Sequence, residues 1–175
     1  MTKGLEGLYI SANIADNDIW TDGENWHKGD MCQKDANDDL RVYVTTSNAK
    51  ERKTICLSSA NLLRVYDKGI SLNDSDITLE ANNLLYKNKL NNYQYHVTTN
   101  GIVNDKNRSN GAVYELYISY ADLGITDSSQ IKLCFNYVNI TGNQKEVTNN
   151  YLVNGQVALN AEEIDGSYIS ISDLI

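Results

Sequence analysis

Residues 111–125 read GAVYELYISYADLGI, and this stretch predicts the fold class of the chain. Through its middle part the side chains alternate, so that one face is apolar and aromatic while the other is mixed and carries Glu115. A period of two residues is typical of a half-buried β-strand. A turn follows, in which Asp122 can cap and Gly124 can adopt a positive φ. We therefore expect a central strand here, with Glu115 and Asp122 as fold-making residues.

The same alternation recurs on both sides of this stretch. Further strands are predicted at 7–14, 40–46, 54–58, 61–66, 92–99, 131–140 and 167–171. Three segments are less regular: 77–85 fits either a strand or a helical turn, 150–157 is expected to be a loop with a weak strand, and 100–111 is expected to be a turn-rich loop. Many short strands at regular spacing with little helix predict an all-β fold, an antiparallel β-sandwich.

Length and charge limit the classes of function. The 175 residues are enough for one domain, 1–175, and the 41% hydrophobic content is that of a globular chain. A net charge of −8 argues against nucleic acid and anionic membranes as partners. No segment approaches the roughly 20 apolar residues needed for membrane insertion, and no leader pattern precedes residue 7. Neutral sugars and cations remain compatible partners.

The three cysteines do not indicate a metal site. Cys134 lies in the apolar run LCFNYV and is interpreted as a small core residue. Cys32 and Cys56 could pair, but their spacing does not require it, and zinc would need CxxC or histidine partners. We expect mostly buried thiols.

The loop 21–39 and the turn before it hold the residues best suited to binding a sugar. Trp20 and Trp26 occur in ADNDIWTDGENWHKGD among acids and a histidine. Sugar recognition needs a flat aromatic ring for the C–H face of a pyranose and planar polar groups for its hydroxyls. The predicted carbohydrate-binding residues are Trp20, Trp26, His27, Asp30, Arg41 and Tyr95. The alternative is that one tryptophan plugs the end of the core.

The same loop is rich in hard oxygen ligands. Calcium binds six to eight oxygens from carboxylates, amides and carbonyls. We predict Asp16, Asp18 and Asp22 as ligands of a structural calcium ion, although their spacing does not match an EF-hand. The alternative is a solvated acidic loop.

Catalysis has little support in the sequence. The histidines are His27 and His96, and His96 alternates within a strand, where it is interpreted as a cross-strand polar residue. No nucleophile elbow, phosphate loop or paired-histidine motif occurs. We expect a protein that is not an enzyme.

Several segments together resemble the family 9 carbohydrate-binding modules and the wider DOMON-like group. They are LYISANIADNDI at 8–19, DDLRVYV at 38–44, YELYISYADLG at 114–124, LCFNY at 133–137 and DGSYI at 165–169, and the resemblance spans about residues 7–172. It implies a jelly-roll-like sandwich, a role in gripping glycans for a larger extracellular enzyme, and bound calcium.

Two positions depart from the pattern of that family. Ser119 stands where the resemblance leads one to expect proline, and Arg41 stands where it leads one to expect glutamate. The first change removes a rigid element of the turn, and the second puts one sugar contact in doubt.

The sequence thus predicts a non-catalytic carbohydrate-binding module of a larger glycan-degrading or glycan-adhering protein. We expect it to be extracellular or on the cell surface, and to bind an oligo- or polysaccharide by aromatic stacking and polar contacts. Its other partners would be the remaining modules of a multidomain parent. The alternative is a structural or adhesion β-sandwich module that binds a protein partner on a cell surface or scaffold.

Overall fold

The computed structural model describes residues 6–21, 37–46, 52–67, 77–80, 83–86, 90–141, 146–153, 156–159 and 169–170. This part of the chain is almost entirely β-strand, with one 3-10 turn at Ser128–Gln130 and no α-helix. It therefore contains no helix able to cross a membrane. The predicted all-β antiparallel fold class is confirmed, whereas the β-sandwich with jelly-roll-like connectivity stays a prediction.

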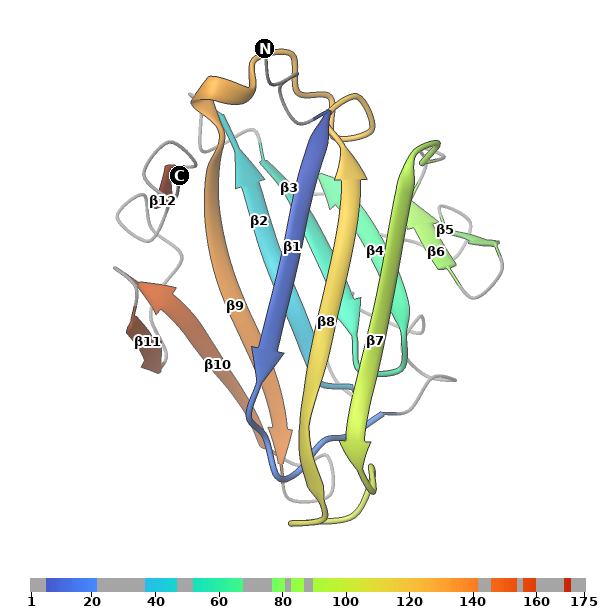
Figure 1. Ribbon diagram of the computed structural model, residues 1–175, viewed down its shortest axis with the longest axis vertical. Coiled ribbons are helices and arrows are strands. Elements are labelled where there is room, and N and C mark those ends of the chain that lie inside the picture. The colour runs from blue at the N-terminus through green and yellow to red at the C-terminus, as the bar shows by residue number, and fades with distance from the viewer. Residues whose placement is uncertain are drawn as a thin grey trace.

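The front layer in Figure 1 is a three-stranded antiparallel sheet in the order β1-β8-β7. Its strands are β1 (Gly7–Ile14), β8 (Ser109–Ser119) and β7 (Tyr93–Gly101). The central strand is β8, which covers the first part of the stretch 111–125 as expected but begins two residues earlier, at Ser109. Its alternation is confirmed, because Tyr114, Leu116 and Ile118 are at most 2% exposed.

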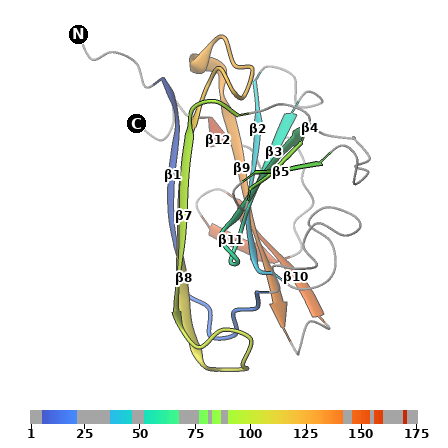
Figure 2. The same ribbon diagram turned by 90° about the vertical axis from the view of Figure 1, so that its right-hand side faces the viewer.

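The rear layer is a larger antiparallel sheet in the order β11-β10-β9-β2-β3-β4, with β12 also paired to β9. Its strands are β2 (Asp39–Thr45), β3 (Arg52–Ser58), β4 (Leu62–Asp67), β9 (Lys132–Thr141), β10 (Glu146–Val153), β11 (Gln156–Leu159) and β12 (Ile169–Ser170). Strands β5 (Ile77–Glu80) and β6 (Asn83–Tyr86) form a separate hairpin. Figure 2 shows the two main sheets face to face, and buried residues of both contribute to one core.

Two of the less regular segments differ from their predictions. The segment 77–85 is a two-stranded hairpin rather than one strand or a helical turn. The prediction of a loop with a weak strand at 150–157 is wrong, because β10 pairs with β9 along seven residue pairs and turns back as β11. Asparagine disfavours strands by itself, but pairing with β9 outweighs that preference in EVTNNYLV.

The turn after β8 depends on Asp122. Its carboxylate accepts hydrogen bonds from the backbone N–H groups of Asn91 (3.0 Å) and Asn92 (2.8 Å) and from the hydroxyl of Ser119 (2.9 Å). The backbone N–H of Ser119 also donates to the carbonyl of Asn92 (3.0 Å), which a proline could not do. Gly124 has a φ of 68° as predicted. Glu115, in contrast, is exposed, so the fold does not depend on it.

Asp122→Ala is expected to lower the free energy of unfolding by about 2 kcal/mol, because three donors lose their acceptor. Burial alone would raise the pKa of Asp122, but the N–H donors of Asn91 and Asn92 outweigh it and hold the pKa below its ordinary value. The stabilisation is therefore present above about pH 4 and lost as the pH falls through the lowered pKa. Urea unfolding at pH 7 and pH 3 measures both effects. Glu115→Ala is the matched control and should change stability by less than about 0.5 kcal/mol.

The cysteines correct one prediction. Cys56 is disulfide-bonded rather than a thiol, and its partner lies outside the described residues. Cys134 is a buried thiol, as expected. The spacing of the sequence could not reveal the bond, because disulfide formation depends on the distance between Cα atoms in the folded chain.

Candidate functional site

The chain after β1 crosses the end of both sheets and is held there by polar contacts. Asn17 accepts a hydrogen bond from the backbone of Ser109, Ile19 accepts one from Asn104 (2.8 Å), and Trp20 accepts one from Asp38 (3.0 Å). In Figure 1 this segment is the blue trace that leaves the lower end of β1 and crosses the lower parts of β8 and β7, and Figure 2 shows it on the side that faces the larger sheet. It contains Asp16, Asp18 and Trp20 of the predicted binding and metal residues.

Trp20 lies in this segment at the end of the two sheets, and it is only 8% exposed. Its indole N–H donates to Oδ1 of Asp18 (2.9 Å), and its carbonyl accepts the hydroxyl of Ser59 (2.6 Å). A ring so buried has no open face on which a pyranose could stack. The geometry favours the alternative in which one tryptophan plugs the end of the core.

Asp16 and Asp18 are already engaged by protein donors. The carboxylate of Asp16 accepts the hydroxyl of Tyr137 (2.9 Å), the amide of Asn139 (3.0 Å) and the backbone N–H of Asp18 (2.9 Å). No group of three or more histidine, cysteine or acidic side chains suited to a metal occurs within the described ranges. Asp22 lies outside them. A structural calcium ion stays a prediction that Asp16 and Asp18 do not support.

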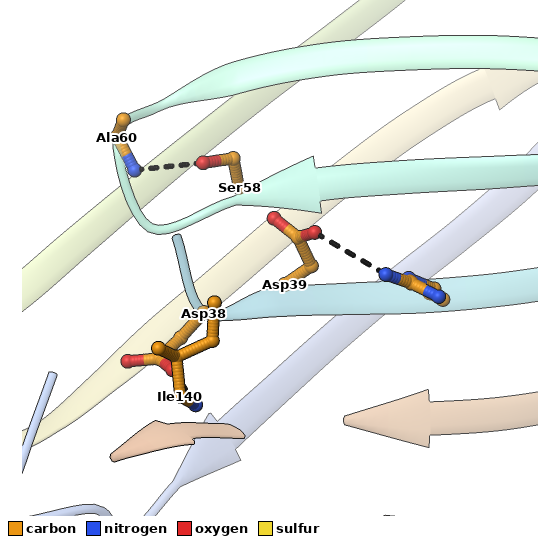
Figure 3. A network of polar contacts seen from close by, with 6 residues as sticks. Asp38, Asp39, Ser58, Ala60 and Ile140 are labelled. Carbon is orange, nitrogen blue, oxygen red and sulfur yellow. Dashed lines mark hydrogen bonds and ion pairs between the residues drawn. The ribbon is translucent and has the colours of Figure 1, made fainter. Parts of the chain in front are cut away.

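Asp38 is a fully buried acid that the sequence analysis did not single out. Its two carboxylate oxygens accept the backbone N–H groups of Trp20 (2.8 Å) and Ile140 (2.6 Å). Figure 3 shows Asp38 beside Ile140, whereas the neighbouring Asp39 forms an ion pair with Arg41 at 3.8 Å. Burial raises the pKa of Asp38 to about 8, although the two N–H donors oppose the shift. Asp38 therefore joins β9 to the segment after β1.

Of the remaining predicted sugar contacts, the two that the structure describes lie on different sheets. Arg41 lies on β2 among buried residues of the larger sheet, and its side chain is 13% exposed. Tyr95 lies on β7, packs against the core and stacks on Tyr93, with ring centroids 6.4 Å apart. Trp26, His27 and Asp30 lie outside the described residues.

The open surface of the three-stranded sheet brings together a different set of side chains. Residues at every second position of β1, β8 and β7 point away from the core and fall into three rows across the strands. The rows are Tyr9–Tyr117–Gln94, Ser11–Glu115–His96 and Asn13–Val113–Thr98, and we call them the Tyr9 face.

The Tyr9 face combines aromatic rings with planar polar groups. Tyr9 is 62% exposed, which makes it the most exposed large hydrophobic side chain of the described residues. Tyr117 lies opposite it and is half-buried, and Glu115 lies opposite His96. A Cβ at Gly7 would collide with the backbone carbonyl of Ile118 and would lie 2.8 Å from the ring of Tyr117, so the glycine permits the close approach of β8 at this position. Cross-strand neighbours lie about 5 Å apart, which places the two tyrosines within reach of one ligand.

Sequence reasoning recognised the strands of the Tyr9 face but not the face itself. The alternation of β1 and β8 was visible, and His96 is a cross-strand polar residue as predicted. Which rows meet depends on the register between strands about 100 residues apart, and no local pattern carries that information. The available signal was an outward-facing tyrosine on β1 and another on β8.

Comparison of the chain with protein-family models, curated proteins and solved structures finds no match. The resemblance to family 9 carbohydrate-binding modules is therefore neither supported nor opposed by these comparisons, and it stays a prediction.

Proposed function

We propose that the protein is a non-catalytic carbohydrate-binding module and that the Tyr9 face is its binding surface. The observation that carries the proposal is the row of Tyr9 and Tyr117 on a solvent-facing sheet, next to rows of hydroxyl, amide, carboxylate and imidazole groups. One ring would cover the apolar face of a pyranose while the neighbouring side chains bond its hydroxyls. The sheet holds these groups in place before a ligand arrives, which lowers the entropic cost of binding.

The register of the two tyrosines argues for a small binding unit. Tyr9 and Tyr117 lie opposite each other on adjacent strands, so we propose an oligosaccharide or a single chain of a polysaccharide as ligand. Glu115 places a negative charge at the centre of the face, which favours neutral over acidic sugars.

The disulfide at Cys56 supports an extracellular or cell-surface location, because disulfides persist mainly in oxidising compartments. The module would then serve a larger glycan-degrading or glycan-adhering protein.

The test is a glycan array followed by calorimetric titration of the strongest neutral oligosaccharide. Tyr9→Ala is expected to weaken that binding at least about tenfold, because the exposed ring is lost, and Tyr9→Phe is expected to retain most of it. Tyr95→Phe is the matched control, because Tyr95 faces the core side of the same sheet. An array without hits, or unchanged affinity in Tyr9→Ala, would contradict the proposal.

A further inference from the structure

Strand β1 is the end strand of the three-stranded sheet, and within the described residues no strand pairs with its other side, which we call its open side. The N–H of Tyr120 donates to the carbonyl of Glu6 (3.0 Å), so these two residues form a hydrogen-bonded pair of the antiparallel ladder. Such pairs alternate along a strand, so the even-numbered residues of β1 bond to β8. The peptide groups of Gly7, Tyr9, Ser11 and Asn13 therefore point to the open side.

The opposite edge of the same sheet, strand β7, is contacted by another part of the chain. There the N–H of Val97, on β7, donates to Oδ1 of Asn61 (2.9 Å), a side chain from the turn between β3 and β4. Strand β1 itself carries none of the sequence features that usually protect an edge, because GLYISANI contains no charge, no proline and no bulge. An uncharged open edge of eight residues suits the addition of another strand.

A groove runs beside this edge. It has a volume of about 750 Å³ and follows β1 along its whole length. The other wall is the core-facing side of β9 and β10, including Leu133, Phe135 and Leu152. Figure 1 shows β10 and β11 extending beyond the edge of β1, so the larger sheet continues where the smaller one stops.

Charge and polarity indicate what would fill the groove. None of its described lining residues is acidic or basic, although the chain carries a net charge of −8. An uncharged occupant is the complementary one.

We propose that the open edge of β1 and this groove bind an extended, uncharged peptide segment of a partner protein, which adds to the three-stranded sheet as a fourth strand. Peptide groups repeating every second residue match only another backbone in extended conformation. Apolar side chains at alternate positions of the added strand contact Phe135 and Leu152, and the others extend the Tyr9 face. Eight residues span about 25 Å, the length of β1.

A second copy of the chain fits the edge less well. Two copies paired through β1 about a two-fold axis would each bring β10 and β11 into the space beside the other copy's β1. A single strand avoids this conflict. The inference does not rest on the proposed sugar binding, because its site is the edge and the groove rather than the Tyr9 face.

The probe is a synthetic peptide of eight alternating valine and threonine residues with a lysine at each end for solubility. Two N-methylated versions separate strand addition from simple apolar contact: one carries N-methyl groups on the valines, the other on the threonines. Because alternate residues bond to opposite edges of a strand, exactly one version blocks the edge that meets β1. We expect that version to bind at least about tenfold more weakly than the other. If the added strand runs antiparallel to β1, the residues that bond to β1 have their side chains on the Tyr9 face, and these are the threonines. The threonine-methylated peptide then has the lower affinity.

Protein variants test the same edge from the other side. Ser11→Pro removes an N–H that points to the open side without breaking a bond to β8, and should weaken binding of the tighter peptide at least about tenfold. Ser11→Ala is the matched control and should bind as the unmodified protein does. Leu152→Glu, which places a charge in the groove, is a second variant should Ser11→Pro disturb the strand.

Hydrogen exchange supplies an independent readout. The amides of Tyr9, Ser11 and Asn13 should become protected when the peptide is added, whereas the already bonded amides of Leu8 and Ile10 should change little. Three results would overturn the proposal. The first is equal binding of the two methylated peptides, and the second is unchanged binding by both Ser11→Pro and Leu152→Glu. The third is protection of the β1 amides by self-association in the absence of peptide.

Discussion

Trp20→Ala is expected to lower the free energy of unfolding by about 3–5 kcal/mol rather than to remove a sugar platform. The side chain is 8% exposed, and its deletion leaves a cavity at the end of the core together with an unpaired acceptor on Asp18. The backbone of Trp20 also bonds to Asp38 and Ser59, so a collapse of this region would spread to β2 and the turn after β3.

Urea unfolding, combined with titration of the oligosaccharide selected on the array, measures this prediction. Trp20→Phe keeps an aromatic ring but loses the indole donor, so it should cost distinctly less than Trp20→Ala. Tyr9→Ala should leave the urea midpoint within experimental error, since Tyr9 is exposed. A Trp20→Ala variant that keeps its midpoint and loses sugar binding would instead establish Trp20 as a binding residue.

The second large effect is a fall in stability with rising pH, caused by Asp38. Its ordinary pKa of 3.8 is raised to about 8 in the folded protein, first by burial and further by the nearby carboxylates of Asp16 and Asp39. Between these two values the folded state binds more protons than the unfolded state. The free energy of unfolding should therefore decrease as the pH rises from about 4 to about 8, by up to about 1.4 kcal/mol per pH unit.

Asp38→Asn separates this titration from other groups. Asparagine does not titrate, so the slope between pH 4 and pH 8 should flatten. Its amide nitrogen cannot accept, so either Trp20 or Ile140 loses a hydrogen-bond acceptor and the variant should be less stable at pH 5 by about 1–3 kcal/mol. Urea unfolding curves at half-unit pH intervals measure both effects. A stability that is constant or rises through this window would contradict the assignment.

Much of the fold was predictable because it depends on local patterns. The bounds of β1 were predicted to the residue, and the burial of Tyr114, Leu116 and Ile118 follows directly from the alternation of 111–125. The role of Asp122 as the residue that closes the turn also follows from its position after a strand and before Gly124.

The candidate site was not predictable in the same way. Trp20 looked like an exposed binding residue because the residues that cover it are distant in sequence, and Asp38 bonds to Ile140, 102 residues away. The polar cluster around Asp16 likewise draws on Tyr137, 121 residues along the chain. These contacts form only when the two sheets pack against each other, and alternation alone does not determine which strands become neighbours.

The amino-acid sequence by itself therefore determined that the chain forms alternating strands and which face of β8 is buried, because side-chain direction in a strand has a period of two residues. The tertiary structure alone decided that Tyr9 meets Tyr117 on an open face, that Trp20 is buried, and that β1 ends its sheet beside an uncharged groove. Register and sheet order are set by contacts between distant segments, and no single stretch of the chain determines the free energy of those contacts.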